Sequence, residues 1–111
     1  MTHLYILEGT TPLAVQDTIT WGQLFATADW KVAHTQVSPD AEVSTVFLGM
    51  DHNFFRDGPP ILWESMVFGG PLDGEQERYA TYHNAAQGHE AMVERCRAAV
   101  AGAANVEGLT S

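Results

Sequence analysis

This chain of 111 residues has one cysteine, few basic side chains and no long apolar run. The single cysteine, Cys96, excludes an internal disulfide, which fits a reducing cytoplasm. No window approaches the roughly 20 apolar residues that a membrane-spanning helix needs. The N-terminus also lacks the basic start and the long apolar stretch of an export signal. The sequence therefore predicts a cytoplasmic protein that does not contact a membrane.

Positive charge is scarce: 5 Lys and Arg residues stand against 14 Asp and Glu residues, for a formal net charge of −9. The excess is concentrated in residues 40–77, where Arg56 is the only basic side chain. Such a block repels phosphate backbones and anionic lipids. We therefore expect no direct binding of nucleic acid, whereas a basic partner or a metal ion would be compatible.

Complete catalytic and cofactor motifs are also missing. There is no Walker loop and no dinucleotide-binding fingerprint, so no cofactor is expected. His89 and Glu90 begin like a zinc-protease helix, but Val93 stands where that motif requires its second histidine. His89 and Cys96 share the apolar stripe of the last predicted helix. Because they lie about 10 Å apart along its axis, we interpret them as a hydrogen-bonded core histidine and a small buried hydrophobe.

What the chain does contain is an α+β pattern. Apolar and β-branched runs predict strands over residues 3–8, 31–37, 42–50 and 61–69, with a short one over 76–80. Helical spacing predicts helices over 18–29 and from the N-cap Thr81 to 101. The predicted fold is a single α+β domain, residues 1–101, in the order β-α-β-β-β-(β)-α, with an antiparallel sheet of four to five strands. Both helices are expected on one face of this sheet, and residues 102–111 are expected to form a frayed tail.

The two strongest predicted strands, 42–50 and 61–69, look apolar on both faces. If both helices cover one face, Trp63 or Phe68 is left toward water, depending on the register, and a two-fold dimer would bury the patch. A docking surface for a different protein, helices on opposite faces, and an N-terminal segment folded across the sheet are the alternatives. Five residues are candidates for the interface: Phe54, Phe55, Trp63, Met66 and Phe68.

The best candidate for a polar site is the run Asp51, His52 and Asn53, which directly follows a predicted strand. His52 could act as a general base or a metal ligand oriented by Asp51, and Glu64 on the paired strand could complete the site. The alternative is a turn in which Asp51 and Asn53 bond to the backbone.

Several segments resemble a family of small uncharacterised proteins of bacteriophages and prophages. They are Tyr5-Ile-Leu-Glu, residues 21–29, the run Val-Ser-Thr-Val-Phe-Leu-Gly-Met-Asp-His-Asn-Phe from Val43, the Gly58-Pro-Pro turn, Met66-Val-Phe-Gly-Gly, Arg78-Tyr-Ala-Thr and Gly88-His. The resemblance spans residues 4–97 and implies a phage accessory product that acts in the host bacterial cytoplasm.

Four functions follow as hypotheses. The first is an accessory protein that works by binding, modulating a host protein or a host defence as a homodimer. The second is a small-molecule binder, for example a sponge for a nucleotide signal. The third is a metal-dependent hydrolase that uses Asp51, His52 and Glu64, and the fourth is a virion component.

Overall fold

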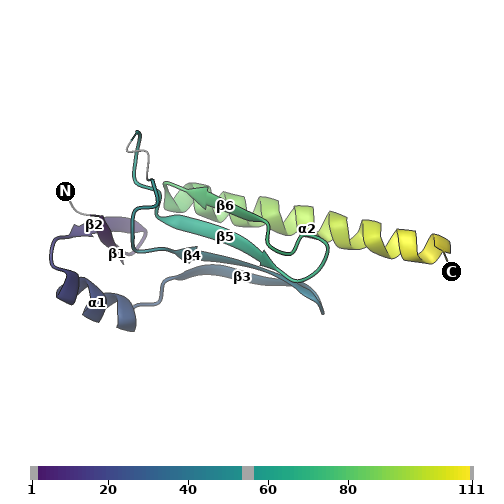
Figure 1. The fold of residues 1–111 in the computed structure, drawn as a ribbon, viewed down its shortest axis with the longest axis horizontal. Coiled ribbons are helices and arrows are strands. Elements are labelled where there is room, and N and C mark those ends of the chain that lie inside the picture. The colour runs from purple at the N-terminus through teal and green to yellow at the C-terminus, as the bar shows by residue number, and fades with distance from the viewer. Residues whose placement is uncertain (1–2, 54–56, 111) are drawn as a thin grey trace.

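The computed structural model describes residues 3–53 and 57–110, with backbone alone for Thr27 and for 104–110. It confirms a single α+β domain: a two-stranded hairpin, a four-stranded antiparallel sheet and two helices (Figure 1). The molecule is elongated, measuring 59 × 31 × 19 Å. The hairpin and the first helix lie at one end of the sheet, and the second helix extends past the other end (Figure 1).

The N-terminal hairpin pairs β1 (Leu4–Glu8) with β2 (Thr11–Val15). The sequence analysis predicted β1 and took residues 9–12 as the end of that strand, so β2 was not predicted. A two-stranded hairpin consists only of edge strands, where proline is tolerated, and Pro12 faces Leu7 in the register. Gly9 makes the reversal possible with a φ of +64°, in the region that glycine alone adopts freely. The element order is therefore β-β-α-β-β-β-β-α.

The sequence offers Asp17 or Thr18 as the cap of helix α1 (Thr18–Thr27), and the structure has Asp17 at this position. The Asp17 carboxylate accepts hydrogen bonds from the backbone N–H groups of Ile19 and Thr20, both at 3.2 Å. It also accepts from the Thr20 hydroxyl, which is the main reason that the pKa of Asp17 is lowered. The helix ends before the predicted residue 29, since Ala28 is already extended.

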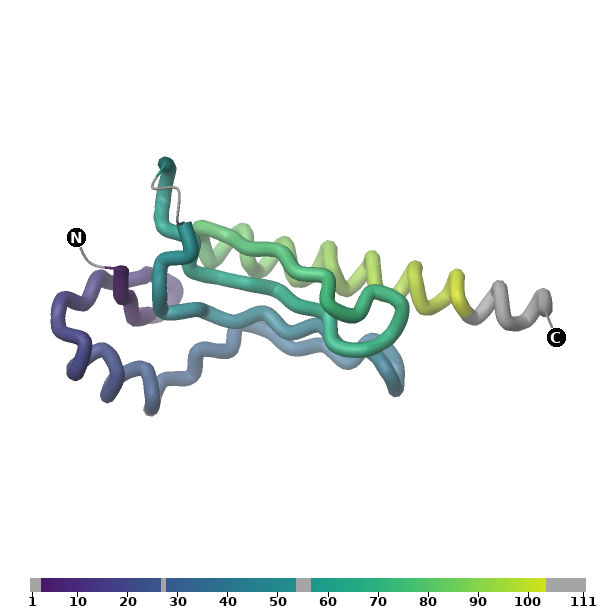
Figure 2. Tube along the Cα trace, viewed as in Figure 1, coloured from purple at the N-terminus to yellow at the C-terminus, as the bar shows by residue number. Residues whose placement is uncertain are grey.

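The four-stranded sheet is a meander in which each strand pairs with the next. Its strands are β3 (Lys31–Ser38), β4 (Ala41–Phe47), β5 (Trp63–Phe68) and β6 (Gln76–Tyr79). The two central strands are shorter than predicted. Gly49, with a φ of +74°, takes the chain out of β4. The connection between β4 and β5 leaves the sheet at the hairpin end (Figure 2).

Helix α2 (Tyr82–Thr110) packs along one face of this sheet and contacts all four strands. The predicted cap is confirmed, because the Thr81 hydroxyl accepts the N–H of Asn84 at 3.0 Å. The helical backbone continues through residues 102–110, which the sequence assigned to a frayed tail. The division of the chain at residue 101 stays a prediction.

The two helices do not share one face of the sheet, contrary to the prediction. Helix α1 packs on β1 and β2, and the unit that it forms with them abuts the end of the sheet. This junction is hydrogen-bonded: the Trp21 indole donates to the carbonyls of Tyr5 and Gly49 at 3.0 and 3.1 Å, and the Tyr5 N–H donates to the Gly49 carbonyl at 2.8 Å. A side chain at Gly49 would collide with the Phe25 ring, so glycine is needed for this close approach.

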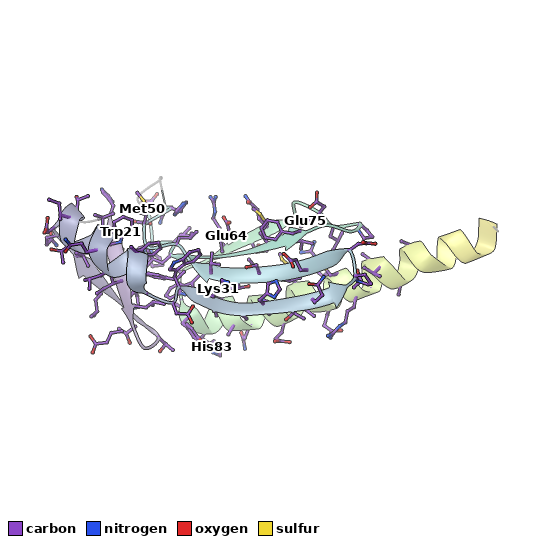
Figure 3. The ribbon with its side chains drawn as sticks, turned by 90° about the horizontal axis from the view of Figure 1, so that it is seen from below. Trp21, Lys31, Met50, Glu64, Glu75 and His83 are labelled. Atoms are coloured by element: carbon purple, nitrogen blue, oxygen red, sulfur yellow. The ribbon has the colours of Figure 1, made fainter. Side chains whose placement is uncertain are left out.

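The register assigns one set of strand side chains to the core beneath α2. The largest of them, Trp63 and Phe47, are 0 % and 2 % exposed and lie 5.3 Å apart between ring centroids. Because side chains alternate along a strand, Met66 and Phe68 fall on the opposite face. In Figure 3, α2 runs along one side of the sheet and Glu64 lies on the other.

Candidate functional sites

The Asp51-His52-Asn53 loop forms a structured turn. One Asp51 carboxylate oxygen accepts the N–H groups of Asn53 and Ile61, at 2.7 and 2.9 Å. The Asn53 amide donates to the carbonyls of Asp57 and Pro59, at 2.6 and 3.0 Å. The side chains of Asp51 and Asn53 therefore bond to backbone groups and stabilise the conformation of the loop.

His52 is also engaged with backbone, since its Nδ1 atom lies 2.8 Å from the Met50 carbonyl oxygen. The backbone N–H of His52 donates to the Ile61 carbonyl at 2.9 Å. Both contacts tie the residue to the strands that flank the loop. This geometry matches the turn interpretation of the three residues.

Glu64 does not join this loop. Its carboxylate accepts a hydrogen bond from the Arg78 guanidinium at 2.9 Å, across the β5–β6 pair on the uncovered side of the sheet. Within residues 3–53 and 57–110, no group of three or more His, Cys, Asp or Glu side chains is arranged to hold a metal ion. The geometry therefore lends no support to a hydrolase built on Asp51, His52 and Glu64.

The interface candidates separate into three groups. Trp63 is fully buried under α2 and cannot contact a partner, so its assignment to an exposed patch is corrected. Phe68 is 48 % exposed and Met66 is half-buried, both on the uncovered side of the sheet. Phe54 and Phe55 lie outside the described residues.

A buried polar network is the feature that the sequence analysis missed. His89 of α2 is 1 % exposed and places its Nε2 atom 2.8 Å from the Thr35 hydroxyl and its Nδ1 atom 2.7 Å from the Thr45 hydroxyl. Thr45 in turn bonds to the hydroxyl of Ser65. The network thus runs from β3 through α2 to β4 and β5.

Desolvation governs the chemistry of this network. Burial lowers the pKa of His89, which keeps the imidazole neutral at neutral pH, with one nitrogen donating and the other accepting. His89, Thr45 and Ser65 are buried between α2 and the sheet, whereas Thr35 is half-buried. We conclude that the network specifies how α2 sits on the sheet, and the prediction of His89 as a hydrogen-bonded core residue is confirmed.

Cys96 lies further along the same helix face and is 2 % exposed. It packs with Val43, Val67, Met92 and Val93. Burial raises the pKa of its thiol, which disfavours the reactive thiolate. The prediction that Cys96 is a small buried hydrophobe is therefore confirmed.

No described helix is long and apolar enough to cross a membrane. Comparison with known proteins adds no assignment: no family model matches the chain, and no curated protein or solved structure matches it.

Proposed function

We propose that this chain is a phage or prophage accessory protein that acts by binding, and that it works as a homodimer in the host bacterial cytoplasm. The observation that carries the proposal is the uncovered sheet face. We define this face as the side chains of the four strands that point away from α2: His34, Gln36, Glu42, Ser44, Val46, Glu64, Met66, Phe68, Gln76 and Arg78. In Figure 1 the sheet lies in front of α2, with no described helix or strand in front of it.

The apolar part of this face is small and lies on the two central strands, β4 and β5. Val46 and Met66 are half-buried by their neighbours on β4 and β5, and Phe68 is 48 % exposed at the end of β5. Methionine and aromatic side chains are enriched in protein interfaces. Apolar side chains with polar neighbours are common in binding surfaces.

The polar rim supports a second copy of this chain as the occupant. Arg78 bonds to Glu64, so one of the two acidic groups of the face is paired with a positive charge, and the imidazole of His34 lies 3.1 Å from the other, Glu42. The chain as a whole carries −9. Two copies therefore repel each other less through this face than through the acidic remainder of the surface.

The size of the face sets the expected affinity. Four strands spaced about 4.8 Å apart, each about six residues long, cover on the order of 400 Å². Two copies would then bury about 800 Å², which is less than the roughly 1,200 Å² at the lower end of stable complexes. We expect a reversible dimer with a dissociation constant in the micromolar range or weaker, strong enough to matter only at high local concentration.

A photo-crosslinking amino acid in place of Phe68 tests the proposal in bacterial cells. Irradiation should give a covalent dimer of about twice the 12.1 kDa chain mass. The matched control carries the same amino acid in place of Glu94, an exposed residue of α2, and should give no dimer. Equal dimer yield from both positions, or no product from position 68, would contradict the homodimer. A crosslink from position 68 to a different protein, in place of a dimer, would overturn the homodimer and identify that protein as the partner.

A further inference from the structure

A second surface, independent of the uncovered sheet face, lies where the N-terminal unit meets the sheet. An open pocket of about 220 Å³ is formed there by the hairpin, the end of α1, the segment that leads into β3, and the end of β4. Its walls include Leu7, Phe25, Trp30 and Phe47, and among the described residues Asp29 is the one ionisable group that lines it. No sequence pattern indicates this pocket, because its lining residues are scattered over about 40 positions and are brought together only by the docking of the hairpin.

The aromatic wall is held in place before any ligand arrives. Phe25 stacks on Trp21 at 5.1 Å between ring centroids and on Trp30 at 5.8 Å, with interplanar angles of 18° and 10°. The Trp30 carbonyl accepts the N–H of Phe47 at 2.8 Å, which ties the stack to the sheet. Ligand sites are usually preformed in this way, so that little ordering is required on binding.

Trp30 stands at the end of this stack and is 39 % exposed. One face of its indole is therefore not covered by Phe25. Tryptophan has the strongest cation-attracting ring face of the aromatic residues. The pocket thus offers an apolar wall that also favours positive charge.

Asp29 supplies the polar end of the pocket. One of its carboxylate oxygens accepts the N–H of Lys31 at 3.2 Å, which orients the side chain. No other hydrogen bond or ion pair to this carboxylate occurs within the described part of the chain, so the second oxygen is available to a ligand. The Lys31 side chain is not among the lining groups.

We propose that this pocket binds an organic cation that has an apolar body, of the size of an alkylammonium ion or a lysine side chain. The apolar body would fill the space against Leu7, Phe25 and Phe47, and the ammonium group would lie between Asp29 and the Trp30 ring. The net charge of −9 raises the local concentration of cations. The same charge disfavours nucleotides and other anions, so this site does not support the hypothesis of a sponge for a nucleotide signal.

The test uses three probes that share a six-carbon body and differ in charge: n-hexylammonium, 1-hexanol and hexanoate. Each probe is titrated at low salt into the full chain. Binding is followed by tryptophan fluorescence, to which Trp30 contributes, and by amide chemical shifts. We expect hexylammonium to bind at least about tenfold more tightly than hexanol, since a nearby carboxylate and a ring face both favour the cation. Hexanoate should bind weakest. Equal affinities for the three probes, or no saturable binding of hexylammonium, would overturn the proposal.

Two charge-matched variants locate the effect. Asp29→Asn keeps an acceptor for the Lys31 N–H and should reduce the affinity for hexylammonium to that for hexanol. Asp40→Asn removes the same charge in the β3–β4 turn, at the far end of the sheet, and should leave both affinities unchanged (Figure 1). An equal loss of hexylammonium affinity in the two variants would show a general charge effect and contradict a specific site.

The source of the cation is decided by one further probe. N-acetyl-lysine methylamide presents the same ammonium on a protein-like body. An affinity comparable with that of hexylammonium assigns the pocket to a lysine of a partner protein, whereas binding of hexylammonium alone assigns it to a free amine. Because the pocket is distant from Phe68, failure of either proposal leaves the other standing.

Discussion

The Thr45→Val variant tests the buried network directly, because it removes one hydroxyl while nearly preserving the side-chain shape. Thr45 is 0 % exposed and its hydroxyl contacts both His89 and Ser65. The substitution leaves two buried polar groups without this partner, and each such group costs about 1–3 kcal/mol. We expect the free energy of unfolding to fall by about 2–6 kcal/mol, a large share of the 5–15 kcal/mol that is typical of a domain.

Urea unfolding followed by tryptophan fluorescence measures this loss, since Trp63 is fully buried beneath α2 and should respond when the helix leaves the sheet. Ser65→Ala removes only one end of the network and should cost about 0.5–1.5 kcal/mol. Thr11→Val is the matched control, because Thr11 is exposed in β2 and should tolerate the change within about 0.5 kcal/mol.

A double-mutant cycle between Thr45→Val and His89→Leu completes the test. Residues in one hydrogen-bonded network couple by about 0.5–3 kcal/mol, whereas independent sites add. A Thr45→Val variant as stable as the wild type, or strict additivity with His89→Leu, would refute the network as described.

Other consequences follow from the same core. Burial lowers the pKa of His89 in the folded state, so in mild acid the unfolded chain binds a proton that the folded chain does not. The free energy of unfolding should therefore decrease as the pH falls below about 6.5, by at most about 1.4 kcal/mol per pH unit. Measurements of stability against pH should show this component in the wild type and not in His89→Gln. Gly88→Ala should destabilise, since its Cβ would collide with the Tyr79 ring, whereas Gly102→Ala, in open space on the same helix, should stabilise by up to about 1 kcal/mol; thermal melts that move both variants in the same direction would contradict the packing. Cys96 should react with a thiol reagent only as fast as the domain opens, and rapid labelling of the native protein would argue against its burial.

Much of the fold could be predicted because its determinants are local. The Asp17 and Thr81 caps, the strands β3 to β6 and the apolar stripe of α2 each carry their signal within a few residues. Strand β2 could not be predicted with the same rule. Pro12 excludes a central strand but not an edge strand, and only tertiary pairing distinguishes the two.

The faces of the central strands were harder to assign, because apolar side chains occur on both. Trp63 and Val67 lie on the inner face of β5, and the period of two carries Ser65 inside with them. Thr45 enters the core beside Phe47 for the same reason. A signal was present: polar side chains at matching inner positions of neighbouring strands, together with a histidine on the helix stripe, indicate a buried network.

The exposed surfaces depended on long-range packing. Most of the apolar side chains of the two central strands are buried beneath α2. Val46, Met66 and Phe68 are the apolar side chains that lie on the uncovered sheet face. The pocket beside Asp29 exists because the hairpin docks against Gly49, a contact that no local pattern reveals.

The most direct test of the proposed mode of action is the molar mass in solution, measured by light scattering over a wide concentration range for the wild type and for Phe68→Glu. Phe68 is exposed, so its replacement should leave the fold intact. We predict that the wild-type mass rises from near 12.1 kDa toward twice that value with increasing concentration, and that the variant remains at 12.1 kDa. A wild-type mass that stays at 12.1 kDa throughout, or an equal rise in both proteins, would contradict a homodimer formed through the uncovered sheet face.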